Sequence, residues 1–198
     1  MESMASDSIR LYGDPILRTR GEDINAFGPS LVATGDAMIK AMHEANGIGL
    51  AAPQFGLALQ LFVVDVDDPA HPINLDGKNV PAKVVMPLVL ANPQLTILEG
   101  PSKICSEGCL SFPGITGEVE RIEKVRVSYL DTQGKPHTLE AEGLLARCLQ
   151  HEYDHCQGVL FIDRMTRAHQ ILVTAKVKKL QRQTVANLKT SKKKTPKA

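Results

Sequence analysis

The chain has 198 residues, of which 43% are apolar and 23% charged, a composition that predicts one soluble globular domain with a substantial core. No apolar run approaches the ~20 residues of a membrane-spanning helix, so we expect no such helix and no membrane partner. Residues 1–10 lack an apolar stretch and carry Glu2 and Asp7, so we expect neither a secretory signal nor a transit peptide, and the four cysteines are expected as free thiols in the cytoplasm.

Charge is distributed unevenly along the chain. Residues 164–198 contain eleven Lys or Arg and no Asp or Glu, whereas residues 1–163 contain the other twelve basic residues and all 22 acidic ones, a net charge of −10. An acidic body with a basic C-terminal segment predicts that this segment meets a polyanion. The alternative is a charged segment that only improves solubility.

In the first half of the chain, the pattern predicts a helix over residues 28–46, with Pro29 in its first turn and Gly47 at its end. Gly47 to Gln54, the sequence GIGLAAPQ, is typical of a glycine-rich turn. A strand is predicted from Gln60 to Asp67, and a surface loop from Asp67 to Lys83. Residues 84–98 predict one or two strands, interrupted at Asn92-Pro93.

In the second half, residues 119–130 alternate partly and predict a strand, followed by a turn over 131–134 and a return strand over 137–141. A helix is predicted from Gly143 to Gln157 and a final helix from Met165 to about Leu188. The expected apolar side of the final helix is formed by Ile171, Leu172, Ala175 and Leu180. Residues 189–198 are expected to be disordered.

These elements predict an α+β fold, with small mixed or antiparallel sheets packed around one central metal-binding helix and with a C-terminal helix. We expect a catalytic domain over residues 1–168, followed by a segment over 169–198 that holds the C-terminal helix and the basic tail.

The central helix carries the sequence His151-Glu152-Tyr153-Asp154-His155. Positions i and i+4 share one helix face, so both imidazoles can bind one ion. Glu152 would then lie beside the metal and act as general acid and base on a coordinated water. Two ordinary histidines on a surface helix are the alternative.

A hydrolytic site of this kind needs a third protein ligand. After His155 the chain offers no glutamate, one aspartate (Asp163) and one histidine (His169), and neither has the spacing of a third ligand in the common zinc proteases. The best donor is Cys109, in the sequence EGCLS. One thiolate and two imidazoles suit Zn²⁺ or Fe²⁺.

Three stretches in this order, residues 47–54, 107–111 and 150–155, resemble the three motifs of the peptide deformylases. The resemblance extends over roughly residues 9–168. It implies removal of the formyl group from N-formylmethionyl nascent peptides, with release of formate, and a divalent ion that is usually Fe²⁺ and is replaceable by Zn²⁺, Ni²⁺ or Co²⁺.

The resemblance also implies roles for individual residues. The Gln54 side chain and the Leu110 N–H are the candidate donors to the oxyanion. Residues expected to bind the substrate are Ile48, Gly49, Cys105, Gly108, Leu144 and Cys148. Those expected to orient the ligands are Glu107, Gln150 and Asp154, although Asp154 is equally compatible with a solvated helix face.

In some bacterial deformylases a C-terminal helix docks on the ribosome, so the basic segment is a candidate contact for ribosomal RNA. Two other functions remain open from the sequence: an endopeptidase that uses the same helix, and a catalytically silent RNA-binding module. Cys109 as a ligand argues against the endopeptidase, and the intact Glu152, Gln54 and three metal ligands argue against the silent module.

Overall fold

The computed structural model describes the backbone of residues 9–194 and the side chains of residues 9–190. Its helices are α1 (Pro29–Glu44), α2 (Gly143–Cys156), α3 (Phe161–Arg164) and α4 (Arg167–Lys194), with short 3₁₀ turns η2 (Pro15–Arg18), η3 (Ala52–Phe55) and η4 (Ala82–Val84). Its strands are β1 (Gly49–Ala51), β2 (Leu61–Val64), β3 (Ile73–Leu75), β4 (Lys78–Val80), β5 (Leu88–Ile97), β6 (Ser102–Gly108), β7 (Thr116–Ile122), β8 (Lys124–Leu130) and β9 (Pro136–Glu142).

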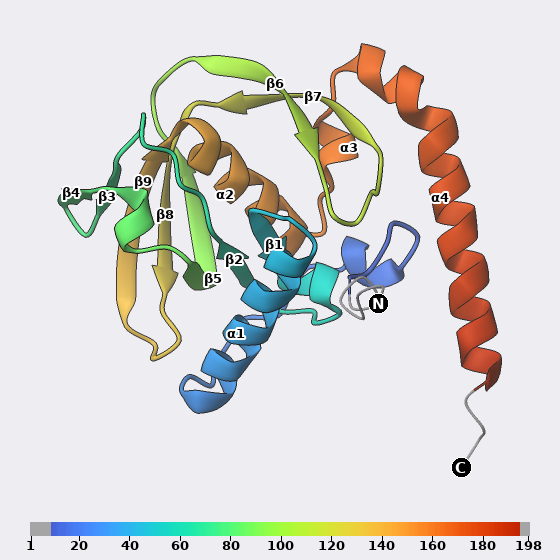
Figure 1. The fold of residues 1–198 in the computed structure, drawn as a ribbon, viewed down its shortest axis with the longest axis horizontal. Helices are drawn as coiled ribbons and strands as arrows, with labels where there is room; N and C mark the ends of the chain where they lie inside the picture. Colours follow the sequence, from blue (N-terminus) through green and yellow to red (C-terminus); the bar gives the residue numbers. More distant parts are fainter. Residues whose placement is uncertain (1–8, 195–198) are drawn as a thin grey trace.

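The strands form a seven-stranded sheet in the order β1-β2-β5-β8-β9-β3-β4 and a separate ribbon of β6 and β7. Every pairing between these strands is antiparallel. Figure 1 shows α2 in the middle of the molecule, with the large sheet on one side and the β6–β7 ribbon arching over it. The predicted α+β fold around a central helix is confirmed.

The alternating directions of the side chains of β2 explain how the sheet packs between two helices. Phe62 and Val64 belong to the apolar cluster that also contains Leu145 and Leu149 of α2. Their neighbours Leu61 and Val63 belong instead to the cluster of Met38 and Met42 of α1. Since successive strand side chains point to opposite faces, α1 and α2 cover opposite faces of the same strand.

The region expected as a loop over residues 67–83 contains the hairpin of β3 and β4, so that prediction was wrong for residues 73–80. Asp76 and Gly77 both have positive φ, at 51° and 82°, which is the geometry of a two-residue type I′ turn. The paired strands are only three residues each, and their polar residues masked the signal.

Residues 84–98 hold one strand, β5, within the predicted one or two, and the expected interruption at Asn92-Pro93 is an irregularity of register. The Asn92 side chain accepts from the Ile24 N–H and donates to the Ile24 carbonyl. One further strand prediction needs correction. Residues 119–130 hold parts of two strands in different sheets, separated at Glu123.

The C-terminal helix α4 stands along one side of the molecule (Figure 1). Its packed stripe is Val173, Val177 and Leu180, which lie against a cluster that includes Leu17 and Phe112. The expected apolar side was therefore largely wrong: Ile171 and Leu172 are 64% and 71% exposed, and Ala175 is exposed as well.

The helix also continues to Lys194, beyond the predicted end near Leu188, so the tail expected to be disordered is helical over 189–194. Residues 195–198 of that tail lie outside the described residues. No helix in the described range combines the length and the apolar character needed to cross a membrane.

Candidate metal centre

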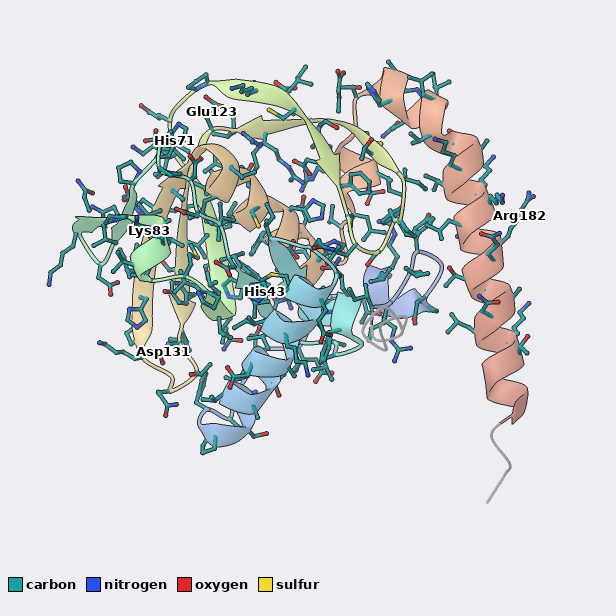
Figure 2. The ribbon with its side chains drawn as sticks, in the orientation of Figure 1. His43, His71, Lys83, Glu123, Asp131 and Arg182 are labelled. Carbon is teal, nitrogen blue, oxygen red and sulfur yellow. The ribbon has the colours of Figure 1, made fainter. Side chains whose placement is uncertain are left out.

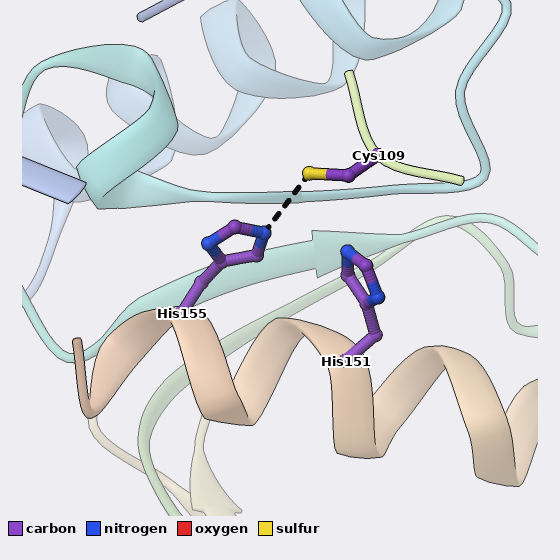
Figure 3. A group of neighbouring side chains, drawn as sticks. All are labelled: Cys109, His151 and His155. Carbon is purple, nitrogen blue, oxygen red and sulfur yellow. Dashed lines mark hydrogen bonds between the residues drawn. The ribbon is translucent and has the colours of Figure 1, made fainter. Parts of the chain in front are cut away.

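Cys109, His151 and His155 converge on one point above α2. Their ligand atoms all lie within 4.8 Å of one another, and the Cys109 Sγ is 3.3 Å from the His155 Nε2. Figure 3 shows the two imidazoles rising from successive turns of α2 toward the thiol above them. Histidines at i and i+4 share a helix face, which is why the short motif predicted this pair.

The third donor comes from the ribbon. Strand β6 pairs with β7 from Ser102↔Ile122 to Gly108↔Thr116, and Cys109 follows directly after the last pair. A turn begins there, closed by the Phe112 N–H donating to the Cys109 carbonyl at 2.9 Å. The ribbon therefore holds Cys109 over the helix at the position where the chain leaves the strand.

Glu107 fixes the orientation of His151. Its carboxylate lies 3.0 Å from the His151 Nδ1, which leaves the Nε2 free to bind an ion. Burial alone would raise the pKa of Glu107, but hydrogen bonds from His151 and Arg121 hold this pKa at about 2. Glu107 is therefore an anion at neutral pH.

Arg121 connects this carboxylate to a second one on α2. It donates to both oxygens of Glu107, at 2.9 and 3.1 Å, and to Asp154 at 2.6 Å. Asp154 also accepts from Arg164, at 2.9 and 3.2 Å, just before α4 begins. Asp154 is 5% exposed, which overturns the alternative of a solvated helix face.

The Gln150 side chain links α2 to the β6–β7 ribbon. Its side-chain amide donates to the carbonyls of Ile122, at 2.9 Å, and of Ala146, at 3.0 Å. The first bond ties α2 to the end of β7, and so to the ribbon that carries Cys109.

The donor set suits a divalent ion. A tetrahedral Zn²⁺ with bonds of about 2.1 Å to nitrogen and 2.3 Å to sulfur keeps its donors roughly 3.5 Å apart. Burial lowers the pKa of His155 well below its usual value, so this imidazole is neutral, as a ligand must be. Burial also lowers the pKa of His151, but its contacts with Cys109 and Glu107 outweigh burial and raise this pKa well above the usual value. Groups that stabilise a proton on His151 also stabilise a metal cation bound there.

Glu152 lies beside these donors and is 4% exposed. Burial raises its pKa to about 7, so this carboxyl can take up and release a proton near neutral pH. The first motif comes very close to it: a Cβ on Gly49 would lie 2.5 Å from a Glu152 oxygen and 2.8 Å from the Cys148 sulfur. Only glycine allows β1 to approach α2 so closely.

Gln54 points its amide nitrogen toward the site. Its Oε1 accepts from the Ala51 N–H at 2.8 Å, and its Nε2 lies 3.4 Å from the Cys109 Sγ and 3.3 Å from the Ser111 Oγ. The bond from Ala51 holds the amide with its donor side toward Cys109. Leu110 follows Cys109, and its side chain would lie 2.7 Å from a Cβ on Gly47, which brings the first two motifs together.

A cavity of about 920 Å³ opens over these groups. Its lining includes Cys109, His151, Glu152, Gln54 and Leu110, and the predicted orienting residue Glu107. It also includes five of the six predicted substrate-binding residues: Ile48, Gly49, Gly108, Leu144 and Cys148. Cys105 is partly buried on β6 and is not among the lining residues. The cavity therefore brings Cys109 and His151 of a three-donor group that suits a metal ion together with the buried carboxyl group of Glu152.

The sequence prediction missed Arg121, Arg164 and Ser111. The sequence did contain a signal for Arg121, because side chains two residues apart on a strand point to the same face and Arg121 follows Val119 by two. The structure buries that face of β7, which carries Gly117, Val119 and Arg121. Arginine on the inner face of a strand indicates a buried carboxylate partner. Arg164 and Ser111 carried no such signal.

The chain is similar to known proteins over most of its length. The family model for polypeptide deformylase matches residues 6–170. The peptide deformylase of Opitutus terrae is 46% identical over 181 residues, which are 90% of this chain and 94% of that protein. A peptide deformylase of Thermotoga maritima is 37% identical over 88% of this chain and 96% of its own length.

Solved structures agree with the sequence matches. The crystal structure of the Thermus thermophilus peptide deformylase has a TM-score of 0.76 and 37% identity, covering 89% of this chain and 98% of that one. A crystal structure of the Plasmodium falciparum peptide deformylase matches with a TM-score of 0.78 and 35% identity, covering 90% of this chain and 97% of that one. Fold and sequence therefore point to the same family.

Proposed function

The chain belongs to the peptide deformylase family, which removes N-terminal formyl groups, and we propose which of its residues perform this hydrolysis. One observation carries the proposal: Glu152 and Gln54 line the same cavity as Cys109 and His151, which form a three-donor group with His155. A proton carrier, an amide donor and a metal centre within one cavity are the components of amide hydrolysis.

The reaction adds water across the formyl C–N bond and yields formate and a free amino terminus. The ion, when bound, supplies a Lewis acid that polarises the formyl carbonyl and lowers the pKa of water. Glu152 accepts the proton of the attacking water and returns it to the leaving amine, a task that fits a pKa of about 7. The Gln54 Nε2 and the Leu110 N–H donate to the oxygen on which negative charge develops.

The substrate is a formylmethionyl nascent peptide. Ile48, Leu144 and Cys148 supply an apolar wall for the methionine side chain. Gly49 and Gly108 allow the extended substrate backbone to approach β1 and β6 closely. Cys105 lies outside the cavity lining, and we assign it no contact with the substrate.

We propose Fe²⁺ as the ion in the cell, with Zn²⁺, Ni²⁺ or Co²⁺ as substitutes. Two imidazoles and one thiolate form a donor set that accepts all four. Cys109 is only partly buried, so a thiolate–Fe²⁺ centre at this position is open to oxidation.

Anaerobically purified protein should carry about one divalent ion per chain, given the one three-donor group among the residues that the structure describes. It should release formate from a formyl-Met-Ala-Ser peptide. A chelator should abolish formate release and added Fe²⁺ or Co²⁺ should restore it, which metal analysis and a formate assay measure together. Internal cleavage of peptides without formate would instead indicate the endopeptidase alternative.

We further propose that α4 binds ribosomal RNA. Lys176, Lys178, Lys179 and Arg182 are exposed, and α4 contains no acidic residue that would neutralise them. Figure 2 shows Arg182 on the side of α4 that faces away from the rest of the molecule. Such a row of cations would contact phosphates without reading sequence. The side chains of Lys192, Lys193 and Lys194 lie outside the described residues.

Replacing the four exposed cations with glutamine should weaken co-sedimentation with ribosomes and lower the slope of log K against log salt by about three. Substitution is preferable to truncation, because removing α4 would uncover the cluster that Val173, Val177 and Leu180 cover. Formate release from short peptides should not change. A matched control neutralises four exposed lysines elsewhere: Lys40, Lys78, Lys83 and Lys135. Equal ribosome binding by both variants would refute the proposal.

A further inference from the structure

One charged side chain in the cavity has no role in the chemistry above. Arg147 lines the same cavity as Ile48, Leu144 and Cys148, and it is partly buried there. It stands four residues before His151 and three after Leu144 on α2, so it shares the helix face that carries the metal ligand. It is also about one helical turn, ~6 Å along the axis, from that ligand.

Arg147 makes no hydrogen bond or ion pair within the described part of the chain. The two carboxylates of the cavity have other tasks: Glu107 is held by Arg121 and His151, and Glu152 lies at the reacting centre. The contrast with Arg121 is clear, because that equally basic side chain contacts two carboxylates. A partly desolvated guanidinium without a partner favours an anion that enters from outside.

The direction of an extended substrate decides which of its residues can supply that anion. If the formyl group lies at the metal and the methionine side chain packs on Leu144 and Cys148, the side chain of the third residue points to the same wall. It then lies about 6.7 Å further out, since a strand rises 3.3–3.4 Å per residue. The aliphatic stem of Arg147 can extend the apolar wall while its guanidinium reaches the rim.

We propose that Arg147 is a specificity-determining residue that favours formylated peptides with Asp or Glu at position three. The inference rests on the proposed function, because it takes the formyl group and the methionine as fixed points. It adds a preference for substrate charge that the metal centre and the apolar wall do not provide.

The test uses the metal-loaded full chain and peptides formyl-Met-Ala-X-Ala with an amidated C-terminus, where X is Glu, Gln or Lys. Amidation removes the terminal carboxylate, which would otherwise compete for the same cation. In the unaltered protein kcat/KM should be about 2–5-fold higher for Glu than for Gln, the size of a partly exposed ion pair, and lowest for Lys. The preference should shrink as salt increases.

Two variants test the assignment. Arg147→Gln should remove the difference between Glu and Lys, and Arg147→Glu should reverse it in favour of Lys. The matched control Lys83→Glu makes the same charge change at an exposed site on η4, outside the cavity lining, and should keep the original preference. Lys83 is labelled in Figure 2.

Three outcomes would overturn the inference: equal kcat/KM for the three peptides, a stronger preference in a formyl-Met-X-Ala-Ala series, or an unchanged preference in Arg147→Glu. Each of these still includes formate release. If no peptide releases formate, the proposed function fails instead, so the two failures are distinguishable.

Discussion

Replacing Glu152 with glutamine should lower kcat for formate release by about 10²–10⁴-fold, the usual contribution of a positioned proton carrier. Glutamine keeps the size and shape of the side chain but can neither accept the proton of water nor return it to the amine. The three ligands Cys109, His151 and His155 are untouched, so the metal content should stay that of the unaltered protein. Glu152 lies against Gly49, so a residue of equal volume is the suitable replacement.

The measurement combines kcat, metal analysis and the visible absorption of the Co²⁺-loaded protein, which reports the ligand geometry. Glu99→Gln is the matched control, since Glu99 is exposed and outside the cavity lining. A Glu152→Gln protein that binds metal and turns over at the original rate would remove Glu152 from the mechanism. Glu152→Ala should lose turnover as well and serves as a second variant.

Helices were predictable from this sequence because their signals are local. Pro29 and Gly47 bound the first helix, and Gly143 and Gly158 bound the metal-binding one; the observed helices Pro29–Glu44 and Gly143–Cys156 agree within about two residues. Periodicity of apolar residues and the special backbone preferences of Pro and Gly are both read within a few positions.

Strands were less predictable because pairing partners decide them. Nothing local separates Ile122 from Lys124, yet β7 pairs with β6 and β8 with β5 and β9. β6 was not predicted, since it presents its apolar Ile104 to solvent and turns the charged Glu107 inward, the reverse of the usual pattern. The burial of the Glu107 carboxylate depends on Arg121, which lies on the neighbouring strand β7 of the ribbon.

The same reason limits what the sequence says about the site. The histidine pair was fixed by helix geometry, and the thiol by its place in a motif. The apolar side of α4 was misassigned, because Ile171 and Leu172 are more apolar in sequence than the valines Val173 and Val177 that pack. Which side of a helix is buried depends on the surface it meets, and the sequence alone does not give that surface.

Replacing Arg121 with leucine should lower the free energy of unfolding by about 3–5 kcal/mol, the cost of breaking a buried ion pair by removing one partner. The Arg121 side chain is 5% exposed, and its two carboxylate partners Glu107 and Asp154 are 8% and 7% exposed. Without the guanidinium, both anions stay buried, and Arg164 reaches only Asp154. Urea unfolding of the metal-free protein measures this loss.

The same substitution should weaken metal binding about 10–100-fold, because Glu107 would no longer be held against the His151 Nδ1 and the ring would lose its fixed orientation. Titration with Co²⁺ gives the dissociation constant. Arg126→Leu is the matched control: Arg126 pairs with Glu140 on the large sheet, but its side chain is 45% exposed, so the expected loss of stability is about 0–1 kcal/mol and the metal affinity should not change. If Arg121→Leu resembled Arg126→Leu in both measurements, Glu107 would hold His151 without help, and the ion-pair network from Arg164 at the end of α3 to the metal centre would have no energetic role.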